Sequence, residues 1–240
     1  MSFKTIDDLL RMTGARLSGK SDVPLAQSRI NHSKFLANNY LHWDLIRPHL
    51  LHPEIHRTYK NDENSEFVIQ YLASEGLIKN AKSGVLQFSS DTAKAYLSGQ
   101  WLEELVYFAY LEAGVEEAYF SQVIDWTLNG INGRNEIDVI ARRGDTLSFT
   151  SCKAMNSGKN KGSMDKLRNY ITETDYWNNH FANNKGKALL VASTDMVDEY
   201  NSKHRYEQLT ARAQVLDVHI IGLEDISWPN IVDRIDGHWD

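Results

Sequence analysis

The chain has 240 residues, 42% of them hydrophobic, and a formal net charge of −6, so it can bury one good core but is not expected to coat nucleic acid through a global positive field. Its single cysteine, Cys152, excludes a disulfide framework and a cysteine-rich zinc cluster. With neither a signal-like start nor an apolar run of membrane-spanning length, the sequence predicts a cytoplasmic protein without a membrane anchor.

The first part of the chain is predicted to be mainly helical. Residues 6–12 and 35–41 have apolar spacings of helical type, and Pro24, Pro48 and Pro53 are expected to divide this region into short pieces. A helix at 66–74, two short strands within 77–88 and a helix from residue 91 follow. The order of helix, hairpin and helix predicts a winged-helix-like element, so we expect a small N-terminal module over residues 1–98.

The second part alternates helices and strands. A strongly helical segment at 101–113 precedes three strands, at 117–128, 136–141 and 147–153. A long helix, a buried strand, another helix and a closing strand then follow, at 163–181, 186–193, 206–216 and 217–222. This order predicts an α/β fold over residues 99–240, with a mixed sheet flanked by helices.

An acid and a lysine stand on two neighbouring predicted strands. Because strand side chains alternate, residues 136, 138 and 140 are expected on one face and residues 137, 139 and 141 on the other. Ser151 and Lys153 are expected to project together, with Cys152 on the opposite, packed face. The glycine-containing turn at 142–145 makes the two strands a hairpin, which brings Asp138 close to Lys153.

This pair favours metal-dependent phosphodiester chemistry. Mg²⁺ and Mn²⁺ prefer carboxylate oxygens, and a bound metal lowers the pKa of its water. A neighbouring lysine can position that water or stabilise the transition state. Asp138 and Lys153 fit these roles, and a further acid is expected from the preceding helix, where Glu103 and Glu104 are the candidates. The alternative is a solvent-exposed ion pair on an edge hairpin, which would contribute little.

Taken together, these motifs resemble the PD-(D/E)xK nuclease superfamily. The runs at 99–107, 135–139, 151–153 and 210–213 look like the nuclease domain of CRISPR-ancillary nucleases activated by cyclic oligoadenylate, and the resemblance covers residues 65–225. It implies a restriction-endonuclease-like fold and a metal-dependent endonuclease that acts on DNA or RNA in prokaryotic antiviral defence or a mobile element. It also implies a homodimer or a partner subunit.

The resemblance carries site residues over to this chain. It implies Glu103 rather than Glu104 as the helical acid, with Mg²⁺ or Mn²⁺ bound by Glu103, Asp138 and the main-chain carbonyl of Cys152. Lys153 corresponds to the catalytic lysine of the family.

Two departures from the family pattern matter. Ser151 stands where the family usually has an acid, and Glu136 is the nearest candidate to lend a carboxylate. The nucleotide-sensing domain of activated family members does not fit into residues 1–60, so cyclic-nucleotide control is expected either to come from elsewhere or to be missing. The alternative function is therefore a catalytically silenced nuclease-fold subunit that binds nucleic acid or a protein partner.

A basic stretch after the hairpin is expected to contact the nucleic-acid backbone, with a solvated lysine-rich loop as the alternative. Its members are Lys159, Lys161, Lys166 and Arg168. Three aromatic residues on the long helix are candidates for stacking on bases, with core packing as the alternative. They are Tyr170, Tyr176 and Trp177.

Overall fold

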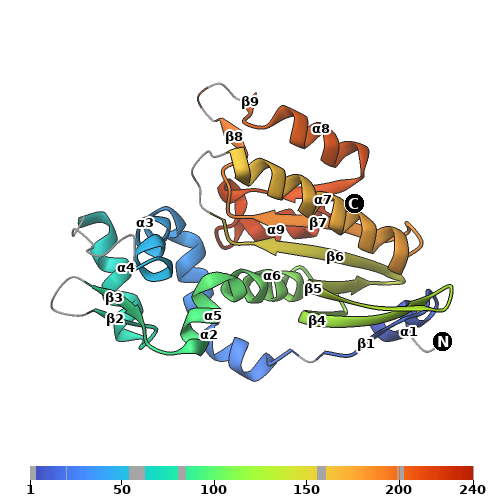
Figure 1. Cartoon of the computed structure of the whole chain (residues 1–240), viewed down its shortest axis with the longest axis horizontal. Helices are drawn as coiled ribbons and strands as arrows, with labels where there is room; N and C mark the ends of the chain where they lie inside the picture. Colours follow the sequence, from blue (N-terminus) through green and yellow to red (C-terminus); the bar gives the residue numbers. More distant parts are fainter. Residues whose placement is uncertain are drawn as a thin grey trace.

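A computed structural model of the chain describes most of its residues (Figure 1). The described residues are 4–19, 21–53, 63–80, 85–155, 161–198, 200 and 203–239. Among them, no helix is both long and apolar enough to cross a membrane.

A six-stranded mixed sheet forms the centre of the molecule, in the order β1-β4-β5-β6-β7-β10. Its strands are β1 (Ala15–Leu17), β4 (Glu117–Leu128), β5 (Ile131–Arg143), β6 (Thr146–Lys153), β7 (Lys187–Ala192) and β10 (Val218–Ile221). The first four pair antiparallel, and β7 and β10 continue from β6 in parallel. The predicted mixed α/β sheet is therefore confirmed.

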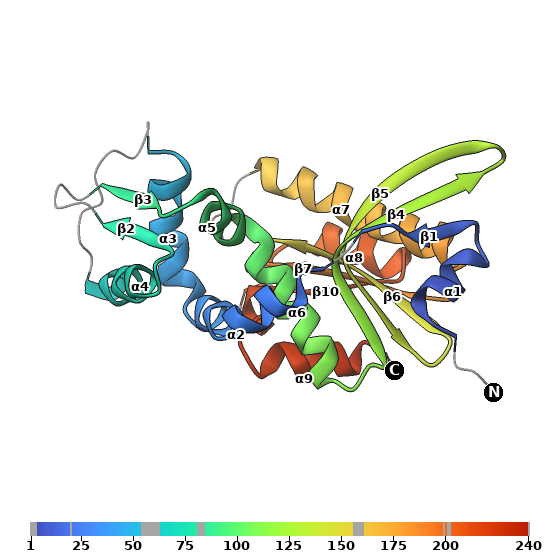
Figure 2. The same ribbon diagram turned by 90° about the horizontal axis from the view of Figure 1, so that it is seen from below.

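Turn glycines set the two hairpins of this sheet. Gly144 takes a φ of +61° in the predicted turn between β5 and β6. Between β4 and β5, Asn129 and Gly130 both have positive φ, at 51° and 79°, as a tight hairpin turn requires. The β4–β5 hairpin is long and curves away from the rest of the sheet as an arm (Figure 2).

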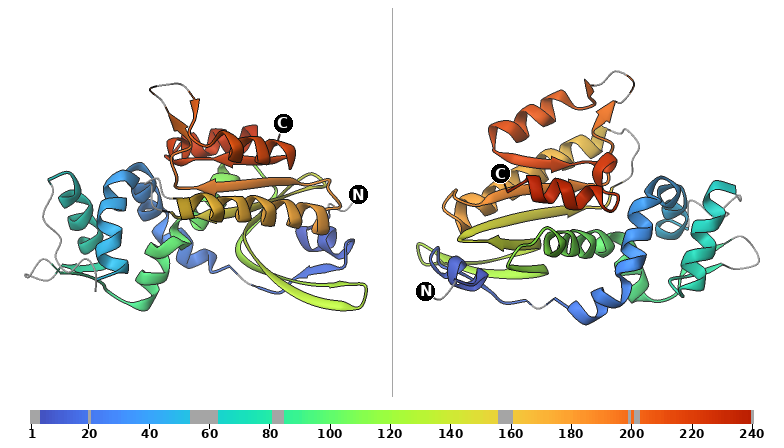
Figure 3. Two further views of the ribbon diagram at one scale, coloured as in Figure 1. Left: turned by 45° about the horizontal axis from the view of Figure 1, so that its top comes forward. Right: turned by 180° about the vertical axis from the view of Figure 1, so that it is seen from behind.

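Helices cover both faces of the sheet (Figure 3). On one face, α6 (Trp101–Glu112) and α9 (Asn230–Gly237) pack on Val139, Ala141 and Val191, in a cluster that we call the α6-side core. On the other face, α1 (Ile6–Arg11) and α7 (Lys161–Phe181) enclose the α7-side core, which contains Ile137, Ile140 and Phe149. Helix α8 (Glu207–Val215) extends this second layer over β7 and β10.

Two of the N-terminal helices are longer than predicted. Pro24 lies in the first turn of α2 (Val23–Asn38), where its missing N–H costs nothing, and Pro48 lies inside α3 (Tyr40–Leu51). The expectation that prolines divide this region into short pieces is therefore wrong for Pro24 and Pro48, whereas Pro53 follows the end of α3.

The predicted helix, hairpin and helix are confirmed as α4, the antiparallel pair β2–β3, and α5. Their bounds are Glu63–Ser74, Ile78–Asn80, Leu86–Phe88 and Asp91–Ala95. The segment Tyr96–Gln100, in which Gly99 departs from helical backbone angles, then leads directly into α6.

The α6-side core runs without a break from α2, α3 and α4 into α6 and the sheet. In addition, α1 and β1 pack with the main sheet rather than with the N-terminal helices. The predicted division into an N-terminal module (1–98) and a second domain (99–240) stays a prediction.

Candidate active site

The two central strands separate at Asp138. The β5–β6 ladder runs from the Arg143–Thr146 pair to the Val139–Thr150 pair and stops there. The carboxylate of Asp138 occupies the opening: its Oδ2 accepts the main-chain N–H of Cys152 at 2.7 Å and the ammonium of Lys153 at 2.6 Å. The predicted closeness of Asp138 and Lys153 is therefore confirmed, and the contact lies in the interior of the sheet instead of at its edge.

Strand alternation breaks at the same level. Ile137 packs in the α7-side core together with Ile140, whereas Val139 packs in the α6-side core. The expectation that residues 137, 139 and 141 share one face is therefore wrong. On β4, Ser121, which lies between the residues paired with Val139 and Ile137, has a φ of +47°. Both strands of the arm are therefore irregular at the level where the β5–β6 ladder ends.

The two candidate acids on α6 point to different places. Consecutive residues of an α-helix are about 100° apart around its axis. Glu104 is fully buried and pairs with Arg29 of α2, whose Nε donates to it at 2.8 Å and whose Nη2 makes a second, short contact. Glu103 instead accepts a hydrogen bond of 2.6 Å from Ser121 Oγ, at the level where the strands separate. Glu104 thus joins two helices, and Glu103 faces the candidate site.

Negative charge is concentrated around Glu103. Burial raises the pKa of Glu103 to about 7, and the charges of Asp138 and Glu136 raise it further, against the lowering effects of Ser121 and Lys153. Glu136 itself is exposed. For Lys153, burial works to lower the pKa, but the adjacent carboxylate of Asp138 outweighs it and the pKa is raised overall. The lysine therefore stays protonated at neutral pH.

Helix α7 supplies two further neighbours of Lys153. The ring centre of Tyr170 lies 4.9 Å from the ammonium nitrogen, at cation–π distance. Glu173 follows three residues later on α7; burial raises its pKa, and it interacts electrostatically with both Lys153 and Asp138. Glu173 is not among the site residues predicted from the sequence. Its spacing of three residues from Tyr170 indicates that the two side chains share one face of α7, but only the packing shows that this face meets β6.

Residues 151 and 152 of β6 lie on opposite sides of the strand. Cys152 is buried in the α6-side core, and burial raises the pKa of its thiol well above the usual value, so the thiol is no nucleophile. Ser151 is fully buried, and its hydroxyl lies 3.3 Å from Asp138 Oδ2 as a weak donor. It brings a hydrogen bond where the resembled family has a carboxylate.

The residues that follow Lys153 are held by α3. Arg47 Nη1 donates to the carbonyl of Ala154 at 3.0 Å, and Tyr40 Oη donates to the carbonyl of Met155. Ser193, at the end of β7, accepts the N–H of Met155 at 2.7 Å. The N-terminal helices thus brace the loop beside the lysine, a role that the sequence reading missed because no local pattern indicates it.

The predicted backbone contacts lie on or before α7. Lys159 falls outside the described residues, and Lys161 is the first residue of α7. Lys166 is exposed, and Arg168 pairs with Asp165 at 3.1 Å. In the described part of the chain, neither Lys166 nor Arg168 hydrogen-bonds to Asp138 or Lys153.

The aromatic residues of α7 differ in exposure. Trp177 is buried in the α7-side core, which agrees with the core-packing alternative. Tyr170 and Tyr176 are half-buried; Tyr170 contacts Lys153, and Tyr176 stacks on His180 at a centroid distance of 3.9 Å.

Two solved structures share this fold. Protein VC1899 from Vibrio cholerae superposes with a TM-score of 0.68 at 18% sequence identity, covering 98% of this chain and 61% of that chain. Can2 from Sulfobacillus thermosulfidooxidans, in complex with cyclic tetra-adenylate, superposes with a TM-score of 0.60 at 17% identity, covering 98% of this chain and 59% of that chain. The chain thus spans about three fifths of the length of either protein.

No family model and no curated protein matches the sequence. At these identities the likeness concerns the fold. The chain shares with both proteins a mixed α/β fold with a helical N-terminal region.

Proposed function

We propose that the protein is a metal-dependent endonuclease that hydrolyses phosphodiester bonds of DNA, with RNA as the alternative substrate. The observation that carries the proposal is the Asp138 carboxylate at the strand opening, bonded to Lys153 at 2.6 Å and to the N–H of Cys152 at 2.7 Å, with Glu103 facing it from α6. An acid, a lysine and a second acid at a break in a sheet can together bind a metal, activate a water and stabilise the charge that develops on a phosphate.

The side chains suit a hard divalent cation. Burial and the charges of Asp138 and Glu136 raise the pKa of Glu103 to about 7, so the site carries carboxylate charge that Lys153 does not balance. Among the described residues, no group of three or more His, Cys, Asp or Glu side chains is arranged so that it could hold a metal ion. Mg²⁺ commonly takes only one or two protein carboxylates, with water and substrate phosphate as its other ligands. Glu103, Asp138 and the carbonyl of Cys152 would hold Mg²⁺ or Mn²⁺.

Each residue has a role in this proposal. A bound metal would lower the pKa of a water and neutralise charge that develops on the phosphate. Lys153, kept protonated by Asp138, orients the attacking water or donates to a phosphate oxygen in the transition state. Glu136 and Glu173 add carboxylates near the site where Ser151 supplies none.

A second candidate function rests on Ser151. Its hydroxyl is directed at Asp138 from 3.3 Å, in the position of the usual family acid, so one anionic ligand is missing. We keep as the alternative a catalytically silenced subunit that binds nucleic acid or a protein partner, or whose site is completed by such a partner. A role in prokaryotic antiviral defence, in a CRISPR or mobile-element setting, belongs to the proposal and is supported by the motifs and by the fold shared with Can2.

Cleavage of supercoiled plasmid and labelled single strands of DNA and RNA, in Mg²⁺, Mn²⁺ or EDTA, tests the proposal. Asp138→Ala should abolish cutting, while Asp145→Ala, at an exposed turn aspartate paired with Lys4, is the matched control. Melting temperatures show whether each variant is folded. Cutting by Asp138→Ala at the wild-type rate would exclude the assignment. Cutting that appears only in Ser151→Glu would favour the silenced subunit.

A further inference from the structure

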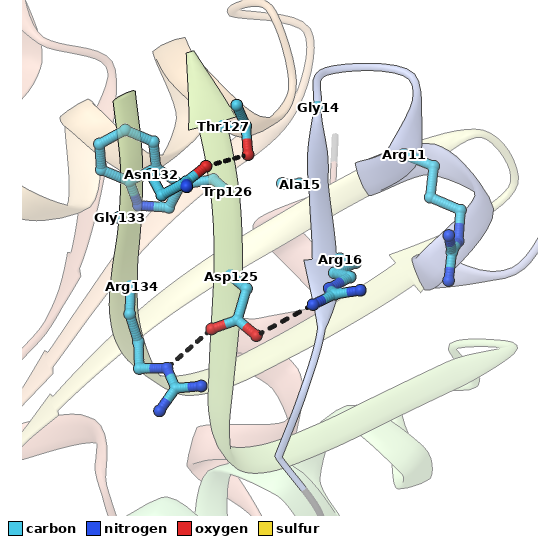
Figure 4. A pocket seen from close by; sticks show the side chains of 10 residues that line it. All are labelled: Arg11, Gly14, Ala15, Arg16, Asp125, Trp126, Thr127, Asn132, Gly133 and Arg134. Carbon is cyan, nitrogen blue, oxygen red and sulfur yellow. Dashed lines mark hydrogen bonds and ion pairs between the residues drawn. The ribbon is translucent and has the colours of Figure 1, made fainter. Parts of the chain in front are cut away.

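A groove of about 890 Å³ lies between β1, the end of β4 and the start of β5 (Figure 4). Its lining includes three arginines, and their side chains are 62%, 63% and 69% exposed. They are Arg11, Arg16 and Arg134. Neither the motifs of the acid–lysine site nor the basic stretch before and on α7 includes any of them.

Two of these arginines share one carboxylate. Arg134 Nε donates to Asp125 Oδ1 at 2.7 Å, and Arg16 Nη2 lies 3.8 Å from Asp125 Oδ2, on the other side of the same residue (Figure 4). The second distance is beyond hydrogen bonding. We call Arg16, Asp125 and Arg134 the row. Each guanidinium carries five N–H donors, so most donors of the two arginines are not used by Asp125. Arg16, Arg134 and Asp125 together carry one unit of net positive charge, while Arg11 is paired with Asp7 at 2.7 Å.

This row lies on the same side of the sheet as Glu136 of β5 and as helix α6, which carries Glu103. Ala15, Ile124 and Ile137 are all buried in the α7-side core. Because strand side chains alternate, residues 16, 125, 134 and 136 point to the opposite side. Glu136 belongs to this set and lies two residues from Asp138 on β5, so the row extends along the strand towards the strand opening.

The distance between row and site suits a polymer. Asp138 and Arg134 are four residues apart on β5, which corresponds to about 13 Å at the rise of an extended strand. Between them β5 has no β6 partner, because the β5–β6 ladder ends at Val139. A nucleic-acid strand that advances about 3.4 Å per phosphate would cover this distance in about four nucleotides. A mononucleotide or a free phosphate would reach only one of the two places.

We propose that this groove binds the phosphate backbone of a polynucleotide to one side of the bond that is cut. The proposal rests on the proposed nuclease function and adds a second contact surface to it. Exposed guanidinium groups bind phosphate oxygens with two N–H donors at once, and the excess charge of the row favours an anion.

A purely structural role predicts different behaviour. Arg16, Asp125 and Arg134 would then be a ladder of cross-strand ion pairs that stabilises the edge of the sheet. In that case Asp125→Asn lowers the melting temperature and leaves nucleic-acid affinity unchanged. If the groove binds phosphates, Asp125→Asn removes a competing anion and tightens binding.

The test measures binding separately from cleavage. Fluorescence anisotropy of a labelled oligonucleotide, single-stranded and as a duplex, is recorded against salt with Ca²⁺ in place of Mg²⁺. The variants are the double substitution Arg16→Gln/Arg134→Gln, and Asp125→Asn. Arg234→Gln is the matched control. Arg234 lies on α9, is 56% exposed and is paired at 2.9 Å with Asp225, which precedes that helix.

The double variant should bind about tenfold more weakly at low salt, and the slope of log K against log salt should fall by about 1.8 for duplex or about 1.4 for single strands. Arg234→Gln should match wild type, and inorganic phosphate alone should not displace the oligonucleotide.

Several results would overturn the proposal. Wild-type affinity and salt slope in the double variant would do so, as would displacement by inorganic phosphate, which marks a small-anion site. Arginine-dependent binding without cleavage in Mg²⁺ or Mn²⁺ would support the groove and count against the nuclease. Normal cleavage with unchanged binding in the double variant would support the nuclease and refute the groove.

Discussion

The same substitution at two adjacent glutamates is predicted to have opposite effects on stability. Glu104→Gln leaves the guanidinium of Arg29, only 8% exposed, without its charged partner. Removal of one member of a buried ion pair costs about 3–5 kcal/mol. A chain of this size loses about 2–4 °C of Tm per kcal/mol, so Tm is expected to fall by about 6–20 °C.

Glu103→Gln should not destabilise the fold. The pKa of Glu103 is raised from 4.5 to about 7, first by burial and then by Asp138 and Glu136. A carboxyl with a raised pKa holds its proton more tightly in the folded state, so stability falls as the pH rises from 4.5 to 7. At 1.36 kcal/mol per unit this loss is at most about 3 kcal/mol, and less for a side chain that keeps contact with solvent. Glutamine carries no charge and avoids the loss.

Thermal melts in EDTA at pH 5 and pH 8 test both predictions. Glu112→Gln, an exposed glutamate at the end of the same helix, is the matched control for the substitution itself. We expect Glu103→Gln to equal or exceed wild type at pH 8, and Glu104→Gln to melt far lower at both pH values. A Glu104→Gln variant within about 2 °C of wild type would refute the buried pair. A Glu103→Gln variant that melts as low as Glu104→Gln would refute its position at the site.

Three further predictions concern packing and pH. Gly133→Ala should cost about 1–3 kcal/mol, because the added Cβ would lie 2.0 Å from a ring atom of Trp126; an unchanged thermal midpoint would contradict this contact. Tyr40→Phe removes the hydroxyl that hydrogen-bonds to Ser193, and the urea midpoint should fall by the equivalent of about 1–2 kcal/mol; an unchanged midpoint would count against the brace. Burial lowers the pKa of His238 to about 3, so stability should be complete above pH 6.5 and fall as the pH drops towards 3. His238→Gln should flatten this loss in melts across the range, and an equal loss in both proteins would contradict it.

Local patterns in the sequence were enough to predict the mixed sheet and the pairing of Asp138 with Lys153. Alternating apolar residues mark the strands, and a turn glycine joins them into a hairpin, so the partner of each residue lies within about fifteen positions in the chain. The helix that precedes the hairpin could also be predicted from the sequence. The apolar residues of α6 recur with a helical period, and Gly114 ends the helix with a φ of +79°.

Only the tertiary structure decided which side chains meet at the site. Alternation breaks at Asp138, where β5 loses β6 as a partner beyond Val139, and a strand pattern assumes a continuous ladder. Glu103 and Glu104 are alike in sequence, and they part because Arg29 of α2, seventy-five residues away, binds one of them in the core. Glu173 reaches the neighbourhood of Lys153 only through the packing of α7 on β6. Periodicity fixes which residues share a face of one element, whereas the contacts between elements depend on long-range packing that no local pattern encodes.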